Sequence, residues 1–252
     1  KMDYNIEPGI GTELGAESVG QGMLAHEKAY LAWLDDVFAR YPDLVIENCS
    51  SGGLRIDYAL LSRYSIQSTS DQEDYRNYAT IAANAGAGVT PEQAAVWSYP
   101  QRAGDKEEVI YNMVNALLVR VHQSGHLAEL SAERMELVKE GIACYKRMRG
   151  DIKKAVPFYP LDVTDNEDLW VCGGLQTEDK AYVAVWKRQM EGKNNDRRLQ
   201  AGTACSETTL SIPLGSLPFA EDRIRVSCLY PEKEPVSFTV EENVLTVTFE
   251  KP

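Results

Sequence analysis

The sequence predicts an α/β protein in two parts: a parallel sheet with crossover helices over residues 1–160, and a small antiparallel β-sandwich over residues 161–252. Three observations predict this fold class. Helix-spaced apolar patterns alternate with short apolar runs in the first part. Polar and glycine-rich clusters follow the short runs, as they do at strand ends in parallel α/β folds. After residues 157–160, short strand patterns separated by turn residues replace the helical ones.

Helices and strands alternate through the first part. Apolar residues recur at helical spacing from Met23 to Tyr41, and Pro42 ends this helix. Leu44–Ile46 is a short apolar run, typical of a buried parallel strand. This βαβα order predicts a parallel sheet. The elements expected next are a helix at 54–63, a strand at 64–67, a helix at 73–85, a strand at 94–97 and helices near 105–120 and 131–149.

The second part shows strand patterns only. Turn residues such as Gly173–Gly174 and Asn194–Asp196 separate them. Short strands at this spacing are typical of an antiparallel sandwich. The expected strands lie at 169–172, 181–187, 208–212, 224–229, 236–240 and 244–249.

Charge and composition exclude several classes of partner. The 252 residues carry a formal net charge of −12, which disfavours nucleic acid and anionic membrane surfaces. No apolar run reaches the roughly 18 residues that span a bilayer. The five cysteines form no C-x-x-C pair, which favours reduced thiols and a cytoplasmic protein. Because the chain opens on Lys1 and its N-terminus looks truncated, a signal peptide remains compatible with the sequence.

The sequence predicts neither a metal nor a cofactor. Its three histidines are His26, on a helix, and His122 and His126, which flank Gly125 near an expected strand end. Surface or supporting roles are commoner for such residues than metal ligation, and there is no H-E-x-x-H motif or carboxylate cluster.

Three polar clusters follow expected strands: Lys1–Asn5, Glu47–Gly53 and Thr69–Asp71. The first and third carry Asp3 and Asp71, and retaining glycosidases need one carboxylate as nucleophile and a second as acid/base. A neighbouring lysine would keep a nucleophilic carboxylate ionised, and paired glycines let a backbone approach a ligand closely. An aspartate at a strand end is also often a helix cap or turn residue, so the residues alone leave both roles open.

The motifs closely resemble glycoside hydrolase family 36. Asn48–Gly53, followed by Arg55 and Asp57, resembles the N-C-S-S-G-G-G-R-F-D segment of that family. Thr69–Asp71 resembles its T-S-D segment at the expected distance downstream, and Lys1–Asn5 resembles its K-W-D-M-N segment. The resemblance implies the C-terminal part of a (β/α)8 (TIM) barrel, from the end of strand four onward, followed by the β-sandwich.

Two later segments extend the resemblance over most of residues 1–160. Trp97–Pro100 resembles a W-S-Y-P stretch of the family, and the helix that ends at Tyr145–Arg149 resembles its last barrel helix. After Pro100, the chain reads Gln101–Gly104, unlike the common family continuation.

The resemblance implies a retaining α-galactosidase-type enzyme. Asp3 looks like the nucleophile at the end of barrel strand four, and Asp71 looks like the general acid/base at the end of strand six. Lys1 would contact galactose hydroxyls beside the nucleophile. The implied ligand is an α-galactoside oligosaccharide or glycoconjugate.

The same resemblance implies further substrate-binding residues. Cys49 and Gly52 would line the pocket beside the 2-position of the sugar, whereas Trp97 would either stack on sugar or fill the barrel core. Asp57 has a rival role as an ion-pair partner of Arg55 and is not counted as catalytic.

Three departures leave the sugar open: Met2, Tyr4 and Ile6 replace the tryptophan, methionine and arginine usual in the family. An α-N-acetylgalactosaminidase or α-galactosaminidase on the same scaffold is therefore an alternative. Others are a non-catalytic carbohydrate-binding fragment and an unrelated barrel hydrolase with chance motif similarity.

The barrel count predicts an incomplete catalytic domain. A (β/α)8 barrel typically needs about 250 residues, and here only residues 1–160 precede the predicted sandwich. We therefore expect the chain alone to be inactive. It would pair with the missing N-terminal half of the barrel, form a homo-oligomer through its open edge or, as we favour, be a fragment of a longer enzyme.

Overall fold

A computed structural model describes residues 1–5, 9–188, 208–215, 217–218, 224–233 and 236–249. The chain divides into two compact units, Lys1–Asp71 (unit 1) and Gln72–Pro252 (unit 2). Three features of the sequence analysis lie outside the described residues: Ile6, the turn Asn194–Asp196 and Cys205. The four described cysteines are free thiols.

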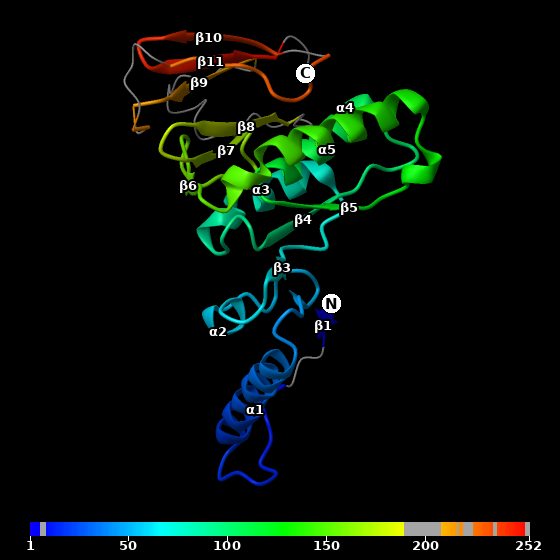
Figure 1. Cartoon of the computed structure of the whole chain (residues 1–252), viewed down its shortest axis with the longest axis vertical. Coiled ribbons are helices and arrows are strands. Elements are labelled where there is room, and N and C mark those ends of the chain that lie inside the picture. Colours follow the sequence, from blue (N-terminus) through cyan, green and yellow to red (C-terminus); the bar gives the residue numbers. More distant parts are fainter. Residues whose placement is uncertain (6–8, 189–207, 216, 219–223, 234–235, 250–252) are drawn as a thin grey trace. The chain divides into compact units, whose positions relative to one another are not determined.

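Unit 1 is a small parallel sheet with its helices. The strands pair in the order β1-β2-β3, with Met2 opposite Asn48, Asp3 opposite Cys49 and Asn48 opposite Gln67. Its apolar core contains Leu34, Ile46, Leu60 and Tyr64. The elements, labelled in Figure 1, are β1 (Met2–Asp3), α1 (Val19–Arg40), β2 (Glu47–Cys49), α2 (Tyr58–Leu61) and β3 (Ile66–Ser68).

Helix α1 begins and ends where local signals place it. Ser18 is its N-cap and accepts a hydrogen bond from the Gln21 amide at 3.2 Å. Arg40 occupies the last turn, where a cation complements the helix dipole, and Pro42 follows the C-cap Tyr41. The predicted helix is therefore confirmed, with a start four residues earlier than its apolar pattern indicated.

The strand predicted at Leu44–Ile46 is wrong in position. Leu44 and Val45 are exposed, and only Ile46 is buried in the core. The strand forms at Glu47–Cys49, inside the polar motif, because those residues pair with both β1 and β3. The helix expected at 54–63 is confined to α2, since Asp57 caps it by accepting from the Leu60 amide at 2.9 Å.

Unit 2 begins with helices around a parallel strand pair. Trp97 on β4 lies opposite His122 on β5, and Asp74, Asp105 and Ser131 cap the three long helices. Val109, Met113 and Leu117 of α4 pack against α5 in an apolar cluster. The elements are α3 (Tyr75–Asn84), η1 (Ala85–Ala87), β4 (Ala94–Ser98), α4 (Lys106–Leu117), β5 (Arg120–Gln123), η2 (Leu127–Glu129) and α5 (Ala132–Ile152).

Two antiparallel sheets complete unit 2. They share an apolar core in which Trp170 and Cys172 of one sheet pack in the same cluster as Leu210, Ile212 and Leu245 of the other. The first sheet has the order β6-β7-β8, with β6 (Val156–Phe158), β7 (Trp170–Gln176) and β8 (Ala181–Lys187). The second sheet has the order β10-β11-β9, with β9 (Thr209–Pro213), β10 (Ser237–Glu241) and β11 (Val244–Thr248).

The predicted fold class is confirmed: an α/β part with parallel strands is followed by antiparallel β-structure. Within it, the strand predicted at 224–229 is wrong, because these residues form no regular element. The sequence analysis missed β6, whose Pro157 reads as a strand breaker but is tolerated at the edge of a sheet. The domain boundary at residue 160 stays a prediction.

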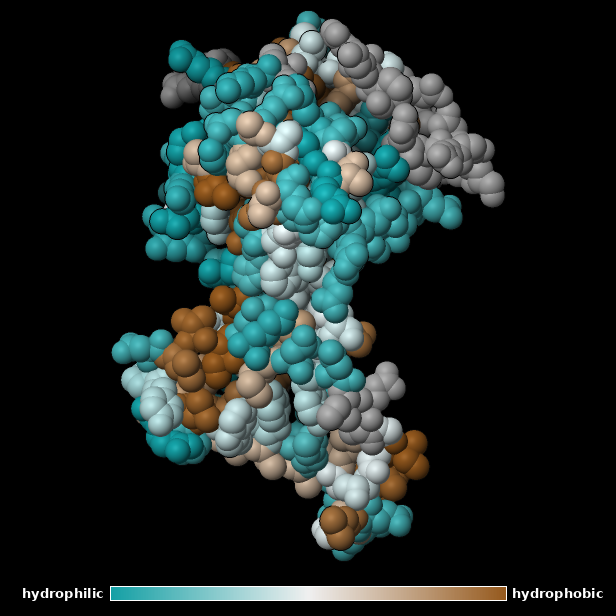
Figure 2. Space-filling model, turned by 90° about the vertical axis from the view of Figure 1, so that its right-hand side faces the viewer, coloured by the Kyte–Doolittle hydropathy of each residue, from teal (hydrophilic) through white to brown (hydrophobic). Residues whose placement is uncertain are grey.

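Apolar side chains lie exposed mainly on unit 1. Figure 2 shows brown side chains gathered on the surface of this unit, and the large exposed ones include Ile10, Leu14, Val45 and Leu54. Among the described residues, no helix combines the length and apolarity that a membrane crossing requires.

Candidate active site

The three polar motifs of unit 1 meet at one edge of its sheet. Asp3 is the last residue of β1, Cys49 is the last of β2, and Thr69–Asp71 directly follow β3. Because the strands are parallel, these ends lie at the same edge. Strands two spacings apart are separated by about 10 Å, a gap that two aspartate side chains can narrow to the roughly 5–5.5 Å of retaining glycosidases. That carboxyl separation stays a prediction.

Side chains from β1 and β2 form a square array on one face of the sheet. Asp3 lies opposite Cys49, and alternation along each strand puts Lys1 beside Asp3 and Glu47 beside Cys49. Met2 belongs to the opposite face, where it packs against the cluster that contains Leu34. The face away from the apolar core therefore presents two carboxylates, an ammonium and a thiol.

Electrostatic interactions confirm this array. The Lys1 Nζ atom lies 3.5 Å from Glu47 Oε1. Partial burial lowers the pKa of the Lys1 ammonium, but Glu47 first, then Cys49 and Asp3, outweigh that effect and raise the pKa above its ordinary value. Lys1 is therefore held in its charged form beside the exposed Asp3 carboxylate.

Cys49 and Ser68 are buried at the strand ends. The Cys49 side chain is fully buried, as expected for a small residue between two neighbouring strands. Ser68 is also fully buried, and its hydroxyl has no hydrogen-bond partner in the described parts of the protein. The sequence analysis gave no role to Ser68 or to Glu47. Both residues follow from the strand register. Side chains alternate along β2, so Glu47 lies on the same face as Cys49, and Ser68 follows the Asn48–Gln67 pair on β3, which puts it beside Cys49.

The turn after β2 explains Gly52. Gly52 has a φ of 76°, and a Cβ atom there would lie 2.3 Å from the Ser70 Cα and 2.7 Å from the Asp71 amide nitrogen. Ser51 shares the left-handed region, with a φ of 41°. A glycine is therefore needed for the turn to pack against the backbone that carries Asp71. The assignment of Gly52 and Cys49 to a sugar pocket stays a prediction.

Polar contacts join the first two motifs. The Ser50 hydroxyl donates to the Tyr4 carbonyl at 2.5 Å, and Arg55 Nε donates to the same oxygen at 3.1 Å. The Ser51 amide donates to Asn5 Oδ1 at 2.6 Å. The Arg55 guanidinium also lies 4.2 Å from the centre of the Tyr4 ring. These contacts fix the loop that directly follows Asp3.

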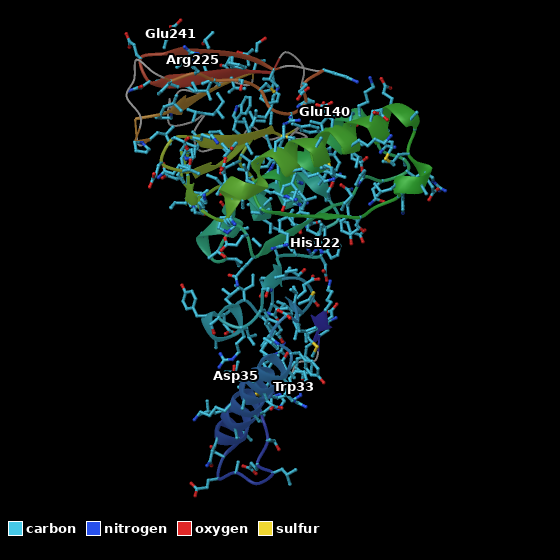
Figure 3. All side chains as sticks on the ribbon, viewed as in Figure 1. Trp33, Asp35, His122, Glu140, Arg225 and Glu241 are labelled. Carbon is cyan, nitrogen blue, oxygen red and sulfur yellow. The ribbon has the colours of Figure 1, made fainter. Side chains whose placement is uncertain are left out.

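Trp97 belongs to unit 2. Its backbone amide donates to the Tyr78 hydroxyl at 3.1 Å. Its ring is half-buried, 5.0 Å from the His122 ring and 5.9 Å from the Tyr99 ring, centre to centre. His122 lies on β5 and is labelled in Figure 3. The aromatic cluster at the ends of β4 and β5 is compatible with sugar stacking and with a core role, so both remain open.

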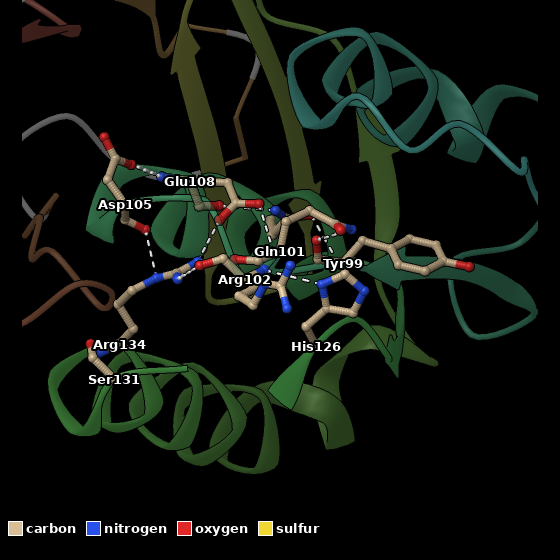
Figure 4. A network of polar contacts seen from close by, with 9 residues as sticks. Tyr99, Gln101, Arg102, Asp105, Glu108, His126, Ser131 and Arg134 are labelled. Carbon is tan, nitrogen blue, oxygen red and sulfur yellow. Dashed lines mark hydrogen bonds and ion pairs between the residues drawn. The ribbon is translucent and has the colours of Figure 1, made fainter. Parts of the chain in front are cut away.

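A buried ion pair fixes the loop after β4 (Figure 4). Arg134 Nη2 lies 2.7 Å from Glu108 Oε2, and the Arg134 guanidinium donates to the carbonyls of Gln101, Arg102 and Asp105. The other oxygen of Glu108 accepts from the Gln101 amide at 2.8 Å. The loop that departs from the family pattern therefore has a defined backbone conformation.

No group of three or more histidine, cysteine, aspartate or glutamate side chains suited to a metal occurs among the described residues. The chemistry that the array itself offers is that of carboxylates beside a cation.

Comparisons with known proteins bear on the fold. No protein-family model and no curated protein matches the sequence. Among solved structures, the chain is similar to the family 36 α-galactosidase AgaA of Geobacillus stearothermophilus in complex with raffinose, with a TM-score of 0.58 and 16% identity over 72% of this chain and 24% of that one. It is also similar to the galactosidase domain of an α-galactosidase–sucrose kinase, with a TM-score of 0.58 and 19% identity over 86% and 30%.

A third similar structure, an α-galactosidase from Lactobacillus brevis, has a TM-score of 0.52 and 15% identity over 85% of this chain and 30% of that one. The chain thus spans only 24% to 30% of the length of these structures. The structural neighbours belong to the group of enzymes that the motifs resemble. They confirm the predicted fold, the C-terminal part of a family 36 barrel with its β domain.

Proposed function

We propose that this chain carries the two catalytic carboxylates of a retaining glycoside hydrolase that acts on terminal α-linked galactose. The observation that supports it best is the position of Asp3 and Asp71 at the same edge of one parallel sheet, beside the Lys1 ammonium. Parallel α/β barrels place their chemistry at this edge. The similar structures include an α-galactosidase solved in complex with raffinose, an α-galactoside.

The proposed reaction is a double displacement. An Asp3 carboxylate oxygen attacks the anomeric carbon from the β face while the Asp71 carboxyl gives its proton to the leaving oxygen. The C–O bond to the leaving group breaks, and a β-linked glycosyl-enzyme forms. Asp71, now ionised, takes a proton from water, whose oxygen attacks the anomeric carbon from the α face. The ester bond from that carbon to Asp3 breaks, galactose leaves with retained configuration, and both groups are regenerated.

Each group of the array has a part in this proposal. The Lys1 ammonium is attracted electrostatically to Asp3, the proposed nucleophile. It would also donate to sugar hydroxyls, and Trp97 would stack on sugar if its ring faces the ligand. Cys49 and Gly52 would border the 2-position. Because this position distinguishes galactose from its 2-amino and 2-acetamido analogues, α-galactosaminidase and α-N-acetylgalactosaminidase activities are assayed beside α-galactosidase activity.

The test uses the longer enzyme of which this chain is expected to be a part. The variants are Asp3→Ala and Asp71→Ala, and Asp43→Ala, at an exposed turn residue, is the control. We expect Asp3→Ala to lower kcat on every substrate by on the order of 10⁴-fold or more. Asp71→Ala should lower kcat on raffinose by about 10²–10⁴-fold, yet spare the first step on aryl α-galactosides, whose leaving group needs little protonation. Asp43→Ala should behave as the wild type.

Azide distinguishes the two roles. In Asp71→Ala, azide replaces water on the α face of the intermediate and gives the α-galactosyl azide. In Asp3→Ala, azide attacks the substrate itself from the β face and gives the β-azide. Proton NMR of the products contradicts the assignment if Asp71→Ala yields the β-azide. Saccharide binding that persists in both variants, with no turnover by the wild type, would instead favour the non-catalytic carbohydrate-binding alternative.

The same assay is applied to the 252-residue chain alone. The chain spans at most 30% of the similar structures named above, and the prediction that it is inactive alone rests on the barrel count. Robust turnover of an aryl α-galactoside by this chain as a monomer would show that count to be wrong. Completion by a barrel half, a homo-oligomer and a cytoplasmic location all remain predictions.

A further inference from the structure

Glu47 is the member of the array without an assigned role. It opens β2, two residues before Cys49, and its side chain is only 14% exposed. Its Oε1 atom is buried and has no hydrogen bond among the described residues, so its 3.5 Å ion pair with Lys1 is what compensates its burial. Removal of this partner would destabilise the fold, but by less than at a fully buried pair, because the Glu47 side chain keeps part of its contact with solvent.

The strand register puts the Lys1–Glu47 ion pair on the same face of the sheet as Asp3 and Cys49. Asp3 and Cys49 are paired positions, and Lys1 and Glu47 each precede them by two residues on the same face. The Lys1 ammonium forms its 3.5 Å ion pair with Glu47 and is also attracted electrostatically to Cys49 and Asp3. A lysine side chain has many rotamers, and a buried anion beside it removes much of that freedom.

We propose that Glu47 is a positioning residue whose carboxylate holds the Lys1 ammonium beside Asp3, in the place where Lys1 meets a hydroxyl of the bound sugar. The proposal rests on the proposed function for its ligand. With Lys1 counted as +1 and the carboxylates of Asp3 and Glu47 as −1 each, the array has a formal net charge of −1. Such an array favours the positive charge that develops on the sugar ring as the leaving group departs.

A double-mutant cycle separates positioning from a general structural role. The variants are Glu47→Gln, Lys1→Met and the double variant, and the probe is galactose binding measured by calorimetry in the full-length protein. We expect Lys1→Met to weaken binding by about 10- to 150-fold, the range of a hydrogen bond from a charged donor. Glu47→Gln should weaken it by about tenfold in the wild-type background, and by less than about twofold in the Lys1→Met background.

Two further variants serve as controls. Asp35→Asn removes a carboxylate from an exposed ion pair of the same unit, 2.7 Å from Arg63 Nε, and should leave galactose binding unchanged. Glu47→Asp keeps the charge one methylene further away and should recover part of the loss. An equal loss from Glu47→Gln with and without Lys1, or no rescue by Glu47→Asp, would overturn the proposal.

A ligand-free measurement keeps this test distinct from that of the proposed function. Carbon NMR of the Lys1 side chain reports its pKa, which should fall in Glu47→Gln and stay unchanged in Asp35→Asn. An unchanged Lys1 pKa in Glu47→Gln would overturn the positioning role even in an active enzyme. If the pKa falls but neither galactose binding nor turnover exists in the wild type, the proposed function fails and the sugar-directed part of this proposal fails with it.

Discussion

Each of the two units contains an ion pair shielded from solvent, and the two pairs differ in the groups that they contact. Arg134 and Glu108 are 2.7 Å apart, with side chains 8% and 5% exposed, and Arg134 also donates to three backbone carbonyls. Lys1 and Glu47 are 3.5 Å apart and 34% and 14% exposed, and the ammonium also interacts with the side chains of Cys49 and Asp3. The first pair fixes a loop backbone, whereas the second lies beside the candidate catalytic residue Asp3.

The balance of burial against charge also differs. Burial raises the pKa of Glu108, and its contacts with the Gln101 amide and Arg134 oppose this without cancelling it. At Lys1, burial works against the charged form as well, but the carboxylate and thiol neighbours prevail and the pKa rises. An ion pair that serves structure can tolerate a destabilised charge, whereas the cation that we propose to bind a ligand has to stay charged.

The largest effect on stability is expected from Arg134→Met, which tests the structural pair. It leaves Glu108 buried without its cation, so we expect a loss of about 3–5 kcal/mol in the free energy of unfolding. Arg102→Met breaks an exposed pair with Glu129 and should cost at most about 1 kcal/mol. Urea denaturation measures both. A loss from Lys1→Met as large as that from Arg134→Met would show that both pairs are structural and remove the contrast.

A smaller effect is expected from the turn that supports Asp71. Gly52→Ala should cost about 2–4 kcal/mol, since the Cβ atom combines a left-handed backbone with a clash against Ser70. Gly15→Ala is the matched control: its φ is 69°, but a Cβ there meets nothing within 4 Å, so about 1 kcal/mol is expected. Thermal unfolding compares the two. Equal losses would show that the turn does not pack against the Asp71 backbone as described.

The smallest effect concerns pH. Because the folded-state pKa of Glu108 is raised above its ordinary 4.5, the folded protein binds more protons than the unfolded one between those two values. Its contribution to stability therefore falls as pH rises through that window, and Glu108→Gln should remove this slope.

Hydrogen bonds from Tyr182 and then Lys180 lower the pKa of Asp151, so the contribution of Asp151 to stability is lost as pH falls. Slopes of the opposite sign in urea titrations would contradict both assignments.

Part of the fold was predictable because its signals are local. The helices α1, α4 and α5 carry apolar residues at helical spacing and begin at Ser18, Asp105 and Ser131, whose side chains cap them. The strand β2 was misplaced because its neighbours, rather than its own hydrophobicity, make it a strand. Residues 224–229 look like a strand and are none, since alternation alone does not provide a pairing partner.

The sequence by itself determined the two-part fold class, the resemblance to glycoside hydrolase family 36, and the choice of Asp3, Asp71, Lys1, Cys49, Gly52 and Trp97 as candidates, because these depend on residue type and order along the chain. Only the tertiary structure decided that Asp3 pairs with Cys49, that Gly52 abuts the Asp71 backbone, and that Glu47 forms an ion pair with Lys1. These relations depend on strand register, and a shift of one residue would turn every side chain to the other face of the sheet. Register is set by pairing between segments far apart in the chain, which no local pattern records.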